Sequence, residues 1–181
     1  MIRWLLWLLG GILLGGVVHL ATVLWLPRTA TQDAYSRLQP ITPVNSIATL
    51  PAPSPDNAVL PFMDPAFATA VCRYDLTGGP LQFSVAVSQA YTSVSFYTRF
   101  GVAYYAINDR AAGRRVIELD LMTELQHGQM PEEEDVTAAD RLIVESPTPT
   151  GVIVLKALAP EPGLMQMARD ALTTARCRIQ Q

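Results

Sequence analysis

Residues 92–107, with the sequence TSVSFYTRFGVAYYAI, are typical of a β-hairpin. The two halves, 92–98 and 102–107, are rich in β-branched and aromatic residues, which favour extended structure. Between them lies Arg99-Phe100-Gly101, whose glycine can adopt the left-handed conformation that a three-residue turn requires. We therefore predict two antiparallel strands joined by this turn.

Period-two patterns extend the sheet on both sides of this hairpin. Residues 81–87 alternate apolar with polar or small side chains, as a half-buried strand does. Residues 116–122, 142–145 and 152–158 supply three more strands, and 147–151 joins the last two. From 164 to 175 the apolar residues recur at helical spacing instead. The prediction is a mainly antiparallel β domain, sandwich-like or barrel-like, with a C-terminal helix packed on the sheet.

The N-terminal run 4–26 holds 23 residues without a Lys, Arg, Asp or Glu. As a helix it would be long enough to cross a hydrocarbon core of about 30 Å. A cleaved secretory signal is the alternative, but its apolar core usually has only about 7–15 residues. His19 and Arg28 also occupy positions where a cleavage site needs small residues. We therefore predict an uncleaved transmembrane anchor over 1–28, which makes the chain α+β overall.

Residues 29–63 are interpreted as a proline-rich tether or a wrapping arm, because prolines prevent both helices and central strands. A β-rich domain is then expected over 64–181, beginning with a short helix over 65–72. That length suits a single domain with a hydrophobic core. The net charge of −3 and the lack of a basic patch exclude nucleic acid as a partner.

Cys72 and Cys177 are the only cysteines and lie near the two ends of the predicted domain. Such a pair suits a disulfide that closes a loop of about 100 residues, worth about 4.7 kcal/mol by chain entropy. Two unrelated buried thiols are the alternative. The positive charge of Arg3 and the α-amino group barely differs from that of Arg28 and Arg37, so charge alone hardly decides the topology. A disulfide favours a domain in the periplasm or at the cell exterior, with the N-terminus in the cytoplasm.

Several motifs together resemble a known family. They are residues 92–97, the run Tyr104-Tyr105-Ala106-Ile107-Asn108-Asp109-Arg110, the run Cys72-Arg73-Tyr74-Asp75-Leu76 leading into Gly78-Gly79-Pro80, the strand 151–158 and the last cysteine. On these motifs the chain, anchor included, resembles small inner-membrane proteins of alphaproteobacteria related to the domain of unknown function 1254 and its paired domain of unknown function 1214. The turn Arg99-Phe100-Gly101 departs from the acidic turn of that pattern. The resemblance implies a membrane-tethered, mostly β domain with a disulfide, and it supplies no activity.

Asn108, Asp109 and Arg110 are the best candidates for a polar site. They end a strand whose other residues are apolar, so their side chains could converge at a sheet edge. Arg110 could hold a carboxylate or phosphate bidentately while Asp109 orients it. The alternative is an Asx turn with an Asp–Arg pair that closes the strand.

Other polar residues give little support for catalysis or metal binding. A catalytic triad would depend on His127 alone, because His19 lies in the apolar run, and His127 is predicted to end a short surface helix. A structural zinc site needs about four protein ligands, and two distant cysteines with one histidine are too few. Met165 and Met167 are interpreted as core residues and not as metal ligands. The acidic run 132–135 is interpreted as the solvated first turn of a helix, with weak calcium binding as the alternative.

The anchor carries a further pattern. Gly11, Gly15, His19 and Thr22 are spaced by four, four and three residues, so they share one helical face. Small residues let another helix approach closely, and an imidazole in hydrocarbon needs a partner. We interpret this face as a docking surface for an integral membrane protein. The alternative is a chance match, because glycine is common in membrane helices. His19 would make a hydrogen bond across helices, lie near the outer leaflet interface, or ligate a haem or chlorophyll-type tetrapyrrole; no other cofactor is predicted.

Two functions from different classes remain. The first is a non-catalytic accessory or assembly protein of the bacterial inner membrane, with a single transmembrane helix in the lipid bilayer and a periplasmic domain. The second is an envelope domain that binds or transforms a ligand through Asn108-Asp109-Arg110. The first is the prediction, because the residues spell out no catalytic set.

Overall fold

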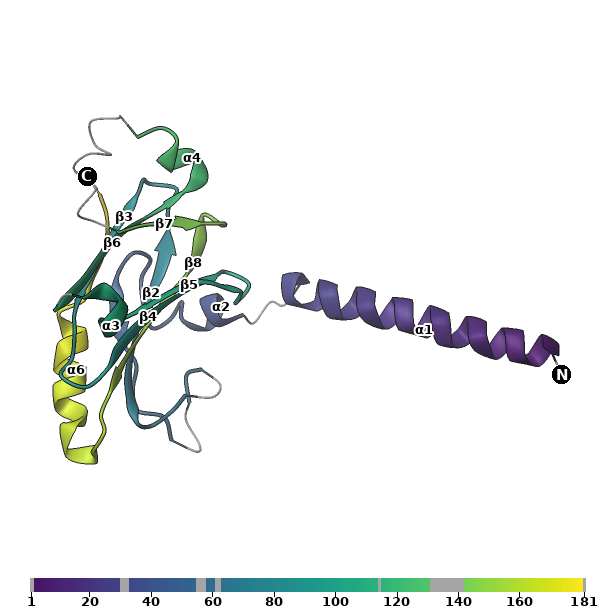
Figure 1. Ribbon diagram of the computed structural model, residues 1–181, viewed down its shortest axis with the longest axis horizontal. Helices are drawn as coiled ribbons and strands as arrows, with labels where there is room; N and C mark the ends of the chain where they lie inside the picture. The colour runs from purple at the N-terminus through teal and green to yellow at the C-terminus, as the bar shows by residue number, and fades with distance from the viewer. Residues whose placement is uncertain are drawn as a thin grey trace. The chain divides into compact units, whose positions relative to one another are not determined.

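A computed structural model of the chain describes residues 2–29, 33–54, 58–60, 63–113, 115–130 and 142–180. The chain forms two compact units, Met1–Gln32 and Asp33–Gln181. The first unit holds helix α1, and the second is a β-rich domain (Figure 1).

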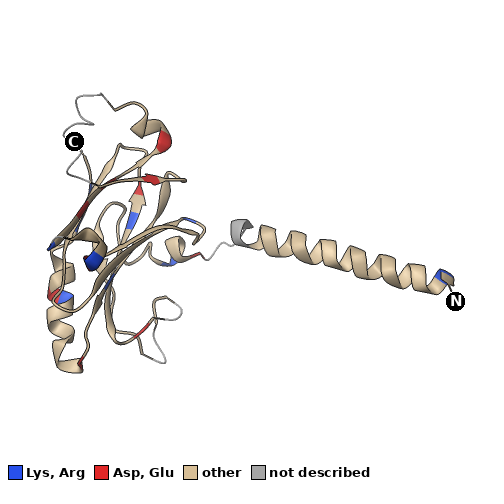
Figure 2. Cartoon of the chain, in the orientation of Figure 1, with Lys and Arg blue, Asp and Glu red and all other residues tan. Residues whose placement is uncertain are grey.

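Helix α1 spans Ile2–Thr29 and is apolar almost throughout. The 25 residues from Ile2 to Leu26 are long and hydrophobic enough to cross a membrane, a property that some N-terminal signal sequences share. Every side chain from Ile2 to Leu26 is exposed, and no charged residue follows Arg3 within this stretch (Figure 2). The long apolar helix predicted from the sequence is therefore confirmed.

Nine strands lie in the described part of the domain, and short helices connect some of them. The strands are β1 (Ile47–Thr49), β2 (Phe67–Asp75), β3 (Leu81–Ala86), β4 (Thr92–Thr98), β5 (Ala103–Asn108), β6 (Val116–Thr123), β7 (Leu142–Ser146), β8 (Thr150–Leu158) and β9 (Arg176–Ile179). The helices are α2 (Ala34–Arg37), α3 (Asp109–Ala112), α4 (Glu124–His127), the 3-10 turn η1 (Pro162–Leu164) and α6 (Met165–Thr173).

These strands form two sheets, which confirms the predicted mainly antiparallel, sandwich-like α+β fold. The five-stranded sheet has the order β1-β2-β8-β4-β5, and the four-stranded sheet has the order β7-β6-β3-β9. Every neighbouring pair of named strands is antiparallel except β6 and β7. Because β7 and β8 belong to different sheets, the connection at 147–149 crosses from one sheet to the other.

The main core lies between the two sheets and follows the predicted alternation. Leu81, Phe83 and Val85 of β3 are buried, and Gln82 and Ser84 between them are partly exposed. Phe96 of β4 reaches Phe83 of β3 with an edge-to-face ring contact, at 6.1 Å between ring centroids. The hairpin of β4 and β5 forms around Gly101, which has φ 80°, as the turn prediction requires.

The short helix predicted over 65–72 is wrong, because residues 67–72 belong to strand β2. This strand lies between β1 and β8, and its seven central residues are all buried. Cys72 faces the main core, whereas Val71 packs against a second apolar cluster on the opposite face of the sheet. A strand buried on both faces has no alternation in its sequence, so the period-two signal is absent.

The tether predicted over 29–63 is, in its described residues, mostly part of the folded domain. Tyr35, Leu38 and Leu50 are buried and pack against Val71 and Val152 on the outer face of the five-stranded sheet. The domain therefore begins at Asp33 and not at residue 64. Of the two interpretations of the proline-rich passage, the wrapping arm agrees with this packing. We call residues 33–50 the arm.

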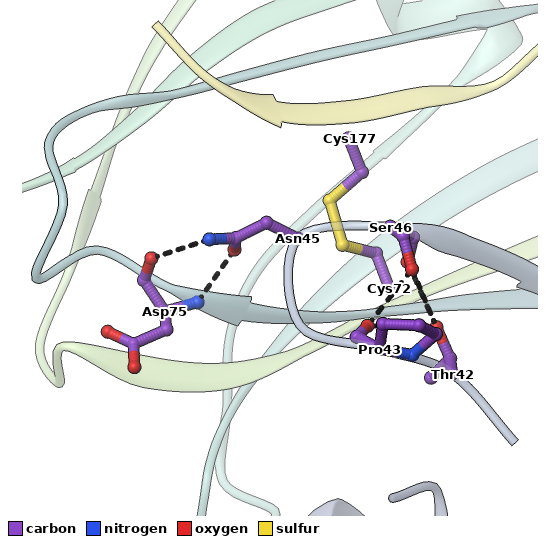
Figure 3. The surroundings of a disulfide bond; sticks show 7 residues. All are labelled: Thr42, Pro43, Asn45, Ser46, Cys72, Asp75 and Cys177. Atoms are coloured by element: carbon purple, nitrogen blue, oxygen red, sulfur yellow. Dashed lines mark hydrogen bonds between the residues drawn. A yellow bond between two sulfur atoms is a disulfide. The ribbon is translucent and has the colours of Figure 1, made fainter. Parts of the chain in front are cut away.

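Asn45 fastens the arm to the end of β2. Its side-chain amide donates to the Asp75 carbonyl at 3.0 Å, and its side-chain oxygen accepts from the Asp75 backbone N–H at 2.8 Å (Figure 3). Its backbone has φ 56°, a left-handed conformation that asparagine tolerates better than most residues. The arm is thus held by side-chain hydrogen bonds to the backbone of β2 as well as by apolar contacts.

The C-terminal helix is confirmed as α6, whose Ala168 and Leu172 are buried against the core. Met165 packs partly against the same core, as predicted. Met167 is 45% exposed, so its prediction as a core residue is wrong. Strand β9 was not predicted; it follows α6 and pairs with β3 at the edge of the four-stranded sheet.

Candidate functional site

The face predicted on the anchor lies in an uninterrupted helix. A Cβ atom built on Gly11 or Gly15 would meet nothing within 4 Å, so the backbone is open to a close neighbour there. Thr22 donates its hydroxyl to the Val18 carbonyl at 2.8 Å, which satisfies this polar group inside its own helix. His19 is exposed, as are the other side chains around it.

Cys72 and Cys177 are joined by a disulfide, with 6.5 Å between their Cα atoms (Figure 3). Both residues are buried, and the described residues include no free cysteine. Cys72 lies on β2 and Cys177 on β9, so the bond links one sheet to the other. Such a link restrains the edge strand β9, which pairs with only one neighbour.

The segment Asn108-Asp109-Arg110 turns from β5 into helix α3. Asn108 is the N-cap, and its side-chain oxygen accepts from the Ala111 backbone N–H at 2.9 Å. Arg110 is exposed, and no ion pair joins it to Asp109 among the described residues. Asp109 Oδ1, however, is buried and has no hydrogen-bond partner. The capping turn is therefore present, and one carboxylate oxygen is left without a donor.

His127 contacts Glu145 at the surface of the domain. Its Nδ1 lies 2.6 Å from Glu145 Oε1, and both side chains are substantially exposed. The adjacent hydroxyl, Ser146 Oγ, donates to the Thr148 carbonyl at 2.6 Å and lies 2.9 Å from the Tyr74 hydroxyl. Since neighbouring residues of a strand point to opposite faces, Ser146 is directed away from the His127–Glu145 pair.

A buried group of hydroxyls links the two sheets. Tyr74 of β2 is hydrogen-bonded to Ser146 of β7 at 2.9 Å and to Tyr104 of β5 at 3.0 Å. Burial raises the pKa of Tyr104 far above its usual value, and the neighbouring Tyr74 raises it further. Gly151 leaves room for this group, because a Cβ atom there would collide with the Tyr74 ring and the Tyr97 carbonyl.

Sequence reasoning missed a charged cluster between the arm and the five-stranded sheet, which we call the Tyr35 cluster: Asp33, Tyr35, Arg73 and Arg99. The Arg73 guanidinium lies 4.2 Å from the Tyr35 ring centroid, and that of Arg99 lies 5.5 Å from it. Arg99 Nε is also 3.7 Å from Asp33 Oδ2. Arg73 is only 7% exposed and donates to the Thr42 carbonyl at 3.2 Å. An arginine inside the apolar run of β2 was the one sequence signal of this cluster.

Sequence reasoning also missed a shallow polar hollow on the outer face of the four-stranded sheet. Its volume is about 150 Å³, and it is lined on one side by Arg176 and Arg178 of β9 and on the other by Glu118 of β6. Gln82 and Ser84 of β3 lie between them. The hollow could not be foreseen, because β9 was not predicted.

The described residues contain no group of three or more His, Cys, Asp and Glu side chains that could hold a metal ion. The acidic run 132–135 lies outside the described residues, so its predicted role stays a prediction. The tetrapyrrole alternative for His19 likewise stays a prediction.

Comparisons with known proteins bear on the fold alone. No protein-family model matches the chain, and no curated protein matches it either. The crystal structure of the VPA0106 protein from Vibrio parahaemolyticus is similar, with a TM-score of 0.60 and 13% identity over 81% of this chain. An uncharacterised protein from Burkholderia cenocepacia gives a TM-score of 0.45 and 11% identity, over 77% of this chain and 46% of its own. The match covers 34% of the Vibrio protein, so the chain has the fold of about a third of that protein.

Proposed function

We propose that this protein is a non-catalytic accessory or assembly protein, anchored in the bacterial inner membrane by α1 and carrying its β domain in the periplasm. The helix docks on an integral membrane partner, and the domain lies on the same side of the membrane as the partner's periplasmic face. The observation that carries the proposal is the face of α1 formed by Gly11, Gly15, His19 and Thr22.

The depth of His19 supports a partner in the membrane. His19 lies seven residues before Leu26, the last residue of the apolar window. Seven residues of helix correspond to about 10 Å, whereas half of a hydrocarbon core is about 15 Å. An imidazole at that depth needs a hydrogen-bond partner, and Gly15, one turn earlier on the same face, lets a second helix come close enough to supply one.

The cysteines support the topology. A disulfide is maintained in oxidising compartments, so a bond between Cys72 and Cys177 favours a periplasmic domain. The N-terminus then lies in the cytoplasm, together with Arg3. This reasoning depends on the bond being formed in the cell, which a nonreducing mass measurement on the purified protein tests directly.

Photo-crosslinking in native membranes tests the docking face. A crosslinking residue in place of Val18 lies on the glycine–histidine face and leaves both glycines intact, whereas one in place of Leu20 lies on the opposite face. We expect Val18→crosslinker to capture one membrane protein reproducibly, and Leu20→crosslinker to capture lipid. In the same experiment, Gly15→Leu should abolish capture from position 18. Equal capture from both positions, or recovery of monomer and lipid alone, would refute the proposal.

The ligand-binding alternative keeps one observation in its favour, the buried Asp109 Oδ1 without a partner. A ligand with an N–H or O–H group could satisfy this oxygen, with Arg110 exposed beside it. In this alternative, Arg110→Ala removes binding or phenotype and leaves thermal stability unchanged, while Asp109→Asn impairs binding as well. If both variants lose only stability, the segment serves as the cap of α3.

A further inference from the structure

The turn between β4 and β5 presents apolar side chains next to an arginine. Phe100 is 45% exposed and Val102 is 61% exposed. Arg99 precedes them, and half of its side chain is accessible. Large apolar side chains at the tip of a hairpin, beside a cation, are the composition of a segment that lies at a membrane interface.

The Tyr35 cluster fixes this turn beside the start of the arm. Arg99 Nε contacts the Asp33 carboxylate, and its guanidinium lies over the Tyr35 ring. Figure 1 shows the β4–β5 turn beside α2, in agreement with these contacts. The turn and the first residue of the domain therefore belong to one local structure.

The covalent chain ties that local structure to the anchor. Three residues, 30–32, stand between Thr29 at the end of α1 and Asp33. Four extended steps of chain span at most about 14 Å. If α1 crosses the membrane, Asp33 must stay within this distance of the helix end, and Arg99 must stay beside Asp33.

A third exposed apolar side chain lies at the same end of the five-stranded sheet. Val44 is 41% exposed and forms a bridge with Arg73 near the end of β2. Asp75, the last residue of β2, pairs with Thr150, whose carbonyl accepts from the Arg99 backbone N–H. Val44 and the β4–β5 turn thus flank one sheet end.

We propose that the β4–β5 turn, Arg99 to Val102, rests on the lipid surface as a second membrane contact of this chain. Phe100 and Val102 enter the interfacial region, and the accessible part of the Arg99 guanidinium binds a lipid phosphate. This contact holds the domain in one orientation on the bilayer. The inference rests on the proposed membrane anchoring by α1.

Depth-dependent quenching tests the contact in the full chain reconstituted into phosphatidylglycerol-containing vesicles. Trp4, Trp7 and Trp25 of α1 are replaced by Phe, which leaves the domain with a single reporter, Phe100→Trp. The matched control is Leu125→Trp, on α4, since Leu125 is 79% exposed. We expect lipids brominated near the headgroup to quench the F100W reporter and to leave the L125W reporter unquenched. Equal quenching of the two reporters, or none of either, would overturn the inference.

A second experiment tests the proposed contact between Arg99 and a lipid phosphate. In the F100W reporter chain, Arg99→Gln should lower the ratio of docked to undocked turn about fivefold, the effect of one arginine near an anionic surface. Arg115→Gln, which removes one charge at another exposed site, should leave the ratio unchanged. Equal effects of the two variants would contradict a specific Arg99–phosphate contact. Thermal unfolding of each variant shows whether the domain stays folded.

Vesicle flotation separates failure of the inference from failure of the proposed function. If the chain does not float with vesicles, α1 is no anchor, and both proposals are wrong. If the chain floats and the F100W reporter is not quenched, only the contact by the turn is wrong.

Discussion

Removing the disulfide should lower the stability of the β domain by as much as the most damaging truncations of its core side chains. Cys72 and Cys177 are 105 residues apart, and closing a loop of that length removes chain entropy worth about 4.8 kcal/mol at 25 °C. A domain of ordinary size is stable by about 5–15 kcal/mol, so loss of the bond removes a large part of the total. We expect the Cys72→Ala/Cys177→Ala variant to unfold at much lower denaturant concentration than the oxidised protein.

Urea unfolding of the full chain in detergent measures this difference. With a slope of about 2 kcal/mol per molar, the loss corresponds to a midpoint lower by about 2–3 M. The signal must come from tyrosine near-UV circular dichroism, because all six tyrosines lie in the domain and all three tryptophans lie in α1. Tryptophan fluorescence would report on the anchor instead.

Two controls distinguish the bond from the buried side chains. The single variant Cys72→Ala should have the same urea midpoint as the double variant, because either change removes the one disulfide. The wild type should have that midpoint too after reduction. A double variant that unfolds at the same urea concentration as the oxidised wild type would refute the loop-closure argument. Two free thiols in a nonreducing mass spectrum would also remove the argument for a periplasmic domain.

Three further predictions concern the interior of the domain. Gly151→Ala should destabilise the domain by about 2 kcal/mol or more in the same assay, because its Cβ collides with Tyr74 and the Tyr97 carbonyl, whereas Gly163→Ala, in open space, should cost far less. Burial raises the pKa of Tyr104 in the folded state, so the contribution of neutral Tyr104 to folding stability is fully present below the pKa of about 10 in the unfolded chain and is lost as pH rises above that value. Tyr104→Phe should therefore make the thermal midpoint fall less steeply above pH 10 than in the wild type. An equally steep fall in both proteins would contradict this assignment. Tyr35→Ala should cost about 3 kcal/mol and increase hydrogen exchange in β1 more than in β4, because the ring packs the arm on the sheet and holds Arg73; uniform exchange throughout the domain would contradict this local role.

The sequence was most informative where one face of a strand meets solvent. Strands β3 and β4 alternate buried with partly exposed residues, and the hairpin turn depends on a single glycine, so both were predictable. Strand β2 was not, because burial of both faces removes the alternation. Strand β9 has four residues, two of them arginines, and is defined only by its pairing with β3 and by Cys177.

The candidate sites divide in the same way. Spacing alone put Gly11, Gly15, His19 and Thr22 on one helical face, because a helix fixes which residues are neighbours. The Tyr35 cluster depends on tertiary contacts between residues far apart in sequence, and the prolines left a tether and a wrapping arm equally compatible with the sequence. The turn at Asn108 was one of the two alternatives taken from the sequence, because a side chain that accepts from a nearby backbone N–H depends only on local residues, whereas helix α3 itself was not predicted.

The disulfide also imposes an order of events during synthesis. Cys72 is made 105 residues before Cys177, which corresponds to roughly 5–20 s at ordinary rates of translation. Throughout that interval β3 lacks β9, its neighbour at the sheet edge, and Cys72 has no other cysteine in the chain with which to form a wrong bond. The disulfide can therefore form only after β9 has been synthesised. The fraction of Cys72 that is still a free thiol then measures how many chains have not yet completed the fold.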